Sequence, residues 1–187
     1  MHKLRPILNV ILLLTITSVI LSCRSPEPAS SATAESNKTV TNPLEGVWRE
    51  AEIVVTGRDA ATIQNPQPSL YIFTPSHYAM MGTFGDRPRA LLKSFDLTTE
   101  EKIAAFDSFW GNAGTYEVSG DILTIRPIVA RNPSFMAGGF DKYQFRLDGD
   151  TLWLTEKSPD FHMRIGEQVV GDPRPPSETR TKLVRVR

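Results

Sequence analysis

The chain has 187 residues, and its 21 basic and 21 acidic side chains give a formal net charge of zero. A protein that binds DNA or RNA usually carries a basic face, so this balance argues against a nucleic-acid partner. Cys23 is the single cysteine, which excludes an intrachain disulfide, and neither His77 nor His162 has a second His or Cys at ligand spacing. We therefore expect no metal centre and no other cofactor.

The chain begins with a short basic segment followed by an apolar run. Lys3 and Arg5 precede an almost wholly apolar stretch, residues 7–21. A membrane-spanning helix needs about 20 apolar residues, whereas a basic start and about 7 to 15 apolar residues are typical of a secretory signal peptide. We therefore expect residues 1–22 to be a signal peptide, whose removal takes away two basic residues and no acid.

The residues around Cys23 suggest a role for this cysteine. The segment Ile20-Leu21-Ser22-Cys23 resembles the lipobox of bacterial lipoproteins, in which signal peptidase II cuts before a cysteine that carries the lipid. The resemblance implies lipidation of Cys23 and anchoring to the cell envelope. Arg24 is not the aspartate of inner-membrane retention, so in a cell with two membranes it implies the outer membrane, facing the periplasm. The alternative is an incidental cysteine in an uncleaved membrane helix.

A polar segment separates this cysteine from the rest of the chain. Residues 24–43 are rich in Ser, Ala, Thr and Pro and have almost no large apolar side chain apart from Val40. Such a segment cannot bury enough surface to offset its ordering entropy, so residues 23–43 are expected to be the lipidated cysteine and a disordered tether. The remaining residues, 44–187, have the size of one ordinary domain.

In this domain, turn residues separate short aromatic and branched runs, a pattern typical of a β protein. Two segments, YEVSGDILTI (residues 116–125) and FRLDGDTLWL (residues 145–154), align without a gap. Each predicts a β-hairpin, with the positive φ of the turn at Gly120 or Gly149. Further strands are expected where aromatic and branched runs lie between turn residues: residues 46–55, 69–74, 78–84 and 181–187.

One helix is expected between these strands. Thr98 is a typical N-cap and Glu101 completes a capping box, after which an apolar stripe from Ile103 through Phe106 to Trp110 ends at Gly111. About eight antiparallel strands with one helix predict an all-β, up-and-down barrel. A closed barrel of this size has no exposed edge and is just wide enough for one small ligand.

The order of the motifs resembles a known family. Gly46-Val47-Trp48 matches the G-x-W of the first lipocalin strand, and LYIFTPSHYAMMGTFGDRPR, WGNAGTYEVSGDILTI, FRLDGDTLWL and LVRVR follow it. The chain resembles the bacterial lipocalin-like domain family over nearly all of residues 44–187. The resemblance implies that Trp48 closes the narrow end of the barrel and that Arg185 packs across it. The mid-chain helix and the long loop over residues 156–178 favour this looser group over classical lipocalins.

Alternation along the strands identifies side chains for the barrel interior. Tyr78, Met80 and Phe84 share one face of their strand, and Tyr143 and Phe145 share one face of another. Such residues either line a cavity or fill a dry core, although the flexible thioether of Met80 favours an adaptable pocket. The candidate ligand-binding residues are Tyr78, Met80, Phe84, Arg87, Arg89, Tyr116, Tyr143 and Phe145.

Two polar segments allow more than one interpretation. GDRPR, residues 85–89, resembles a recurrent stretch of the lipocalin-like family and is expected in a loop. Either Asp86 pairs with an arginine in a solvated loop, or Arg87 or Arg89 contacts an anionic head group at the barrel rim. His77 follows a proline turn, and a catalytic role would require a group that positions it.

No motif of serine hydrolases, P-loop enzymes or dinucleotide binders is present, and we assign no catalytic residue. The main hypothesis is a membrane-anchored lipocalin-like lipoprotein that binds a small apolar or amphipathic molecule. One alternative is an isomerase or cyclase in which tyrosines and a loop acid or His77 transfer protons on an apolar substrate. Another is an envelope interaction module with a filled barrel, which contacts an unspecified protein through residues 156–178.

Overall fold

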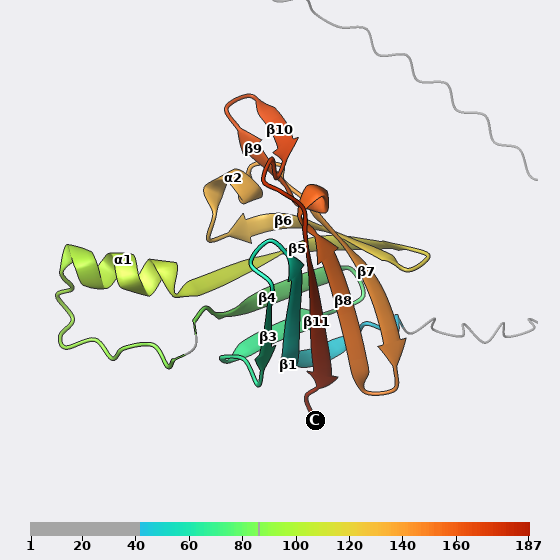
Figure 1. Cartoon of the computed structure of the whole chain (residues 1–187), viewed down its shortest axis with the longest axis horizontal. Coiled ribbons are helices and arrows are strands. Elements are labelled where there is room, and N and C mark those ends of the chain that lie inside the picture. The colour runs from blue at the N-terminus through green and yellow to red at the C-terminus, as the bar shows by residue number, and fades with distance from the viewer. Residues whose placement is uncertain (1–41, 86) are drawn as a thin grey trace, which may run out of the picture. The chain divides into compact units, whose positions relative to one another are not determined.

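The computed structural model describes residues 42–85 and 87–187 (Figure 1). The predictions of a signal peptide over residues 1–22, of lipidation at Cys23 and of most of the tether lie outside the described residues. The described part of the chain forms a closed antiparallel barrel of eight strands, which confirms the predicted fold class.

The barrel has an up-and-down topology. Its strands pair in the order β1-β3-β4-β5-β6-β7-β8-β11, and β11 pairs back with β1, so the barrel has no open edge. β2 pairs with the second half of β1, and β9 pairs with β10 in a separate hairpin. The strands are β1 (Gly46–Gly57), β2 (Ala61–Gln64), β3 (Ser69–Phe73), β4 (His77–Thr83), β5 (Phe109–Ser119), β6 (Ile122–Ala130), β7 (Asp141–Asp148), β8 (Thr151–Lys157), β9 (His162–Ile165), β10 (Gln168–Gly171) and β11 (Ser177–Arg185). The helices are α1 (Thr99–Asp107), α2 (Pro133–Met136) and the 3-10 turn η1 (Ser158–Asp160).

Both hairpins predicted from the sequence repeat are present. The turn between β5 and β6 has Gly120 at φ 62°, and the turn between β7 and β8 has Gly149 at φ 56°. These left-handed conformations are readily adopted by glycine, which has no Cβ to clash with the backbone. The two hairpins supply four consecutive strands of the barrel.

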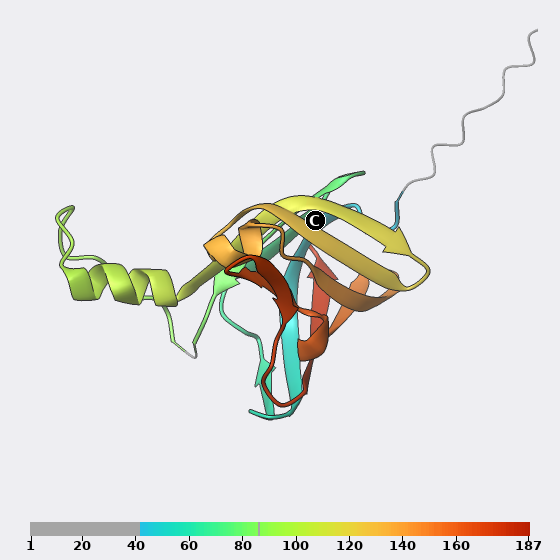
Figure 2. The same cartoon turned by 90° about the horizontal axis from the view of Figure 1, so that it is seen from above.

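The helix begins as predicted and ends earlier. The Thr98 side chain accepts a hydrogen bond from the Glu101 amide, and the Glu101 side chain accepts one from the Thr98 amide. The predicted extension through Trp110 is wrong, because Phe109 and Trp110 begin β5 and pair with β4. No residue of α1 is buried, and Figures 1 and 2 both show α1 and its preceding loop standing away from the barrel.

The segment expected to be one long loop contains regular structure, so this expectation is wrong. After η1, the strands β9 and β10 form a hairpin whose turn contains Gly166 at φ 60°. β-Branched residues on both sides of a two-residue turn favour such a hairpin. The hypothesis that residues 156–178 contact a partner protein stays a prediction.

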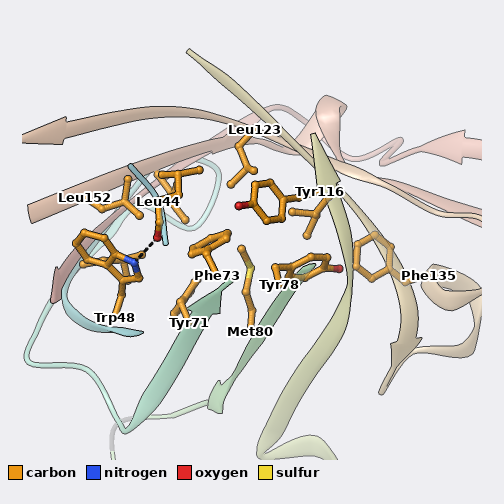
Figure 3. Packing of buried hydrophobic residues seen from close by; sticks show 13 residues of the cluster. Leu44, Trp48, Tyr71, Phe73, Tyr78, Met80, Tyr116, Leu123, Phe135 and Leu152 are labelled. Atoms are coloured by element: carbon orange, nitrogen blue, oxygen red, sulfur yellow. Dashed lines mark hydrogen bonds between the residues drawn. The ribbon is translucent and has the colours of Figure 1, made fainter. Parts of the chain in front are cut away.

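The hydrophobic core lies inside the barrel and receives side chains from nearly every barrel strand (Figure 3). It contains Leu44, Trp48, Tyr71, Phe73, Tyr78, Met80, Tyr116, Leu123, Ile125, Phe135, Leu152, Leu154 and Leu183. Along β7 the inward positions are partly or fully buried and the outward positions are exposed, as the predicted alternation requires.

Candidate functional site

Trp48 and Arg185 close one end of the barrel, and we call this pair the plug. Trp48 is fully buried, and its indole Nε1 donates a 2.9 Å hydrogen bond to the Leu44 carbonyl oxygen (Figure 3). The Arg185 guanidinium carbon lies 4.0 Å from the centroid of the indole ring, and Nη1 donates a 2.7 Å hydrogen bond to the Glu45 carbonyl oxygen. Gly46 has φ 133°, and a Cβ there would lie 2.3 Å from Arg185 Nη1. This close approach explains the glycine of G-x-W and confirms the predicted pair.

The interior next to this plug is filled. Phe73 and Tyr116 pack edge to face with ring centroids 5.4 Å apart, and the Tyr116 hydroxyl donates a 2.7 Å hydrogen bond to the Thr74 carbonyl oxygen. Tyr78 is 2% exposed, and its hydroxyl has no hydrogen-bond partner among the described residues. In this half of the barrel, side chains form a packed core.

Further from the plug, inward-facing side chains of the barrel and residues of β2 and the neighbouring loops line an open cavity of about 390 Å³. Tyr71 and Met80 are buried on its wall, whereas Ile63 and Phe84 are about half exposed and form part of its rim. This volume lies in the range of small-molecule sites. The lining residues are Glu50, Ile53, Val55, Ile63, Pro66, Gln67, Tyr71, Met80, Thr83, Phe84, Gly85, Trp110, Asn112, Tyr143, Glu156, Thr179 and Thr181.

A β-bulge in β1 determines which of its side chains reach the cavity. The pairing of β1 with β11 shifts register between Glu50 and Glu52. Before the shift Trp48 and Glu50 face inward, and after it Ile53 lines the cavity although it lies three positions further along. A bulge adds one residue to one strand and so changes the face on which the following side chains lie. The bulge therefore makes Glu50 and Ile53 consecutive inward-facing residues of β1.

Five polar residues form a continuous band on one side of the cavity, which we call the polar arc: Tyr71 on β3, Glu50 on β1, Thr181 on β11, Glu156 on β8 and Tyr143 on β7. These strands are consecutive around the barrel. The Tyr71 hydroxyl donates a 2.7 Å hydrogen bond to Glu50 Oε1, and Tyr143 lies directly opposite Glu156 in the β7–β8 ladder.

Burial changes the acid–base behaviour of the polar arc. It raises the pKa of the Glu50 carboxyl, although the hydrogen bonds from Tyr71 and Ser69 oppose this rise. It also raises the pKa of Glu156, with a further contribution from nearby acidic side chains. Asp141 is buried near this arc, and burial followed by the charge of Glu156 raises its pKa well above 3.8. Among the described residues, no basic side chain lines the cavity and neither glutamate forms an ion pair.

An apolar cluster on β4 and β5 completes the cavity. It contains Met80 and Trp110, with Phe84 at the rim, and the polar residues Thr83 and Asn112 lie beside it on the same strands. Gly82 is directly opposite Trp110 in the β4–β5 ladder, and a Cβ at this glycine would lie 2.8 Å from the indole ring. Trp110 therefore packs on the β4 backbone. Its ring also meets the Tyr71 ring edge to face, with centroids 5.7 Å apart.

The structure brings part of the predicted set together. The candidates that line the cavity are Met80, Phe84 and Tyr143. The other interior candidates lie in or against the core without lining the cavity, and they are Tyr78, Tyr116 and Phe145.

The two candidate arginines lie outside the cavity lining. Arg89 Nε donates a 3.0 Å hydrogen bond to Ser108 Oγ, and Nη2 donates one of 2.9 Å to the Ala105 carbonyl oxygen, so it lies at the C-terminal end of α1. Arg87 is not among the residues that line the cavity, and Asp86 is outside the described residues. Contact of either arginine with an anionic head group stays a prediction.

Sequence reasoning missed the two glutamates of the polar arc. The signal was present, because the inward alternation of Leu152 and Leu154 on β8 continues to Glu156. Likewise, Glu50 lies two positions after the inward-facing Trp48. An acid at a position where alternation requires an inward side chain indicates a polar interior site.

Other sequence candidates for chemistry do not contribute to the cavity. His77 is exposed at the start of β4, and its Nδ1 lies 2.9 Å from Ser76 Oγ, as expected of a turn residue. Within residues 42–85 and 87–187, no group of three or more His, Cys, Asp or Glu side chains is arranged to hold a metal ion. No helix in this part of the chain is long and apolar enough to cross a membrane.

Comparison with family models and with curated proteins gives no match. No protein-family model matches the chain, and no curated protein matches it at a significant level.

Proposed function

We propose that this protein is a membrane-anchored, lipocalin-like lipoprotein whose barrel binds a small amphipathic molecule. The single observation that carries the binding proposal is the cavity of about 390 Å³, whose lining combines the apolar cluster of Met80, Trp110 and Phe84 with the polar arc. Envelope anchoring rests on the resemblance of residues 20–23 to a lipobox, and the family on the G-x-W and the motifs that follow it.

The lining favours an amphipathic ligand over a wholly apolar one. An apolar group that buries about 150 Å² against Met80 and Trp110 would gain about 4 kcal/mol from leaving water. A wholly apolar ligand would also cover Glu50 and Glu156 without satisfying them, and an unpaired buried polar group costs about 1 to 3 kcal/mol. A ligand with one polar end avoids this cost.

Native mass spectrometry of the full chain after incubation with a lipid extract of the source cells tests the proposal. We expect a retained small molecule, and we expect Val55→Trp to abolish retention because Val55 lines the cavity. Val54→Trp is the matched control, since the neighbouring Val54 does not line the cavity. Equal retention by both variants, or no retained molecule in any extract, would contradict binding in the barrel.

A second function, proton transfer on an apolar substrate, is favoured by one contact. The Tyr71 hydroxyl lies 2.7 Å from Glu50 Oε1 in the cavity wall. A carboxylate in partly desolvated surroundings is a stronger base than in water, and a tyrosine next to it can supply or relay a proton. Such a pair would suit an isomerase or cyclase.

A generic carboxylate-base substrate, 5-nitrobenzisoxazole, tests this second function. A base removes its ring C–H proton while the N–O bond breaks to give a coloured phenoxide. We expect Glu50→Gln to abolish turnover and Glu52→Gln to leave it unchanged, because Glu52 pairs with Gln64 and does not line the cavity. A wild-type rate equal to that in buffer would exclude Glu50 as an effective base.

A further inference from the structure

We propose that the cavity selects an organic cation, namely a protonated amine that carries an apolar ring or chain. This inference rests on the proposed binding function and names the chemical class of its ligand. Three independent properties of the lining support it: its charge, its hydrogen-bonding groups and its aromatic rings.

The charge of the lining has one sign. Glu50 and Glu156 both line the cavity, and no Lys, Arg or His is among the lining residues of the described chain. An ionised carboxylate away from water is costly unless a counter-charge approaches it. Since the described residues supply none at this cavity, a cationic ligand would provide the missing partner.

Several hydrogen-bonding groups of the lining can accept a hydrogen bond from a ligand. The proton of the Tyr71 hydroxyl is already donated to Glu50. The side-chain oxygens of Asn112 and Thr83, two further lining residues, are buried and have no hydrogen-bond partner among the described residues. An ammonium group donates hydrogen bonds and accepts none, so it matches this lining better than a carboxylate or phosphate does.

Aromatic rings complete the site. Trp110 meets Tyr71 with ring centroids 5.7 Å apart and Phe84 with centroids 6.4 Å apart, and all three residues line the cavity. The faces of such rings attract cations, most strongly where water is excluded. Aromatic rings beside carboxylates favour a cation over a neutral hydrogen-bond donor of the same shape.

The test uses three probes with the same rigid hydrocarbon cage and different charge: adamantylammonium, adamantanol and adamantanecarboxylate. Isothermal titration calorimetry on the full chain measures their affinities. We expect adamantylammonium to bind at least about tenfold more tightly than the carboxylate, with the alcohol between them. Equal affinities, or tightest binding of the carboxylate, would overturn the inference and leave binding in the barrel intact. Absence of binding by all three probes would count against both proposals.

Two variants assign the selectivity to the glutamates. In Glu156→Gln we expect adamantylammonium affinity to fall toward that of adamantanol, and adamantanol affinity to change less than about twofold. Glu117→Gln is the control, because Glu117 is exposed on β5 and does not line the cavity. Unchanged preference for the cation in Glu156→Gln and in Glu50→Gln would contradict the inference. The ranking of the probes on the wild-type chain remains decisive if either variant fails to fold.

Discussion

Replacement of Arg185 by methionine tests whether the plug stabilises the barrel. Methionine keeps most of the apolar stem but loses the cation 4.0 Å from the Trp48 ring centroid, worth about 0.5 to 2 kcal/mol. It also loses the 2.7 Å hydrogen bond to the Glu45 carbonyl oxygen, and bonds of this charged kind contribute about 1.5 to 3 kcal/mol. Together these losses predict destabilisation by about 2 to 5 kcal/mol, or roughly 4 to 20 °C in Tm.

Urea unfolding followed by tryptophan fluorescence and by far-ultraviolet circular dichroism measures this effect. The expected result is a lower midpoint with an unchanged m-value, which indicates a change in stability rather than in the compactness of either state. Arg187→Met is the matched control, because Arg187 also pairs with Asp150 but is exposed. We expect no measurable change for this control, since exposed ion pairs contribute little. Equal midpoints for the two variants would refute the reasoning that the contacts of Arg185 with Trp48 and Glu45 stabilise the fold.

Three further substitutions probe the cavity side of the barrel. Gly82→Ala places a Cβ 2.8 Å from Trp110, so we expect destabilisation by about 1 to 3 kcal/mol and a shift in tryptophan emission; normal stability would show that the ring moves freely. Burial raises the pKa of Asp141, so this carboxyl stays protonated to a higher pH in the folded state than in the unfolded state. The free energy of unfolding therefore falls as pH rises from about 4. Asp141→Asn should reduce this slope in urea titrations repeated across pH, with the remainder due to the raised pKa values of Glu50 and Glu156, and a profile parallel to that of the wild type would contradict the prediction. Glu156→Leu should raise the unfolding midpoint while adamantylammonium binding is lost, and a lowered midpoint would mean that the carboxyl supports the fold.

Features carried by neighbouring residues could be predicted from the sequence. The hairpin turns at Gly120 and Gly149 follow from Gly-Asp between alternating strands, and the start of α1 follows from Thr98 and Glu101, because each depends on contacts within a few residues. The Trp48–Arg185 contact joins distant segments. It was nevertheless predicted, because the resemblance of Gly46-Val47-Trp48 to a G-x-W motif implies an arginine of the last strand across the tryptophan.

Features that depend on strand register could not be predicted in the same way. Phe109 and Trp110 continue an apolar helical stripe as well as they begin a strand, and only their pairing with β4 decides between the two. The bulge between Glu50 and Glu52 arises from the register of β1 against β11, at opposite ends of the domain. Without that bulge, simple alternation along β1 would place Ile53 on the outer face.

The division of the barrel into a filled half and a hollow half follows from the inward residues of three adjacent strands. From the plug toward the cavity these change from apolar to polar: Leu147, Phe145 and Tyr143 on β7, Leu152, Leu154 and Glu156 on β8, and Leu183, Thr181 and Thr179 on β11. The strands are in register, so each step along them forms one level of the barrel wall. Polar side chains in a filled core need hydrogen-bond partners within the protein, because burying them without such partners costs free energy that only packing contacts would offset. Around a cavity the same side chains can instead meet a ligand or water. The polar level at Glu156 therefore lies where the interior is open, which is the arrangement that a binding site requires and that a purely structural barrel does not.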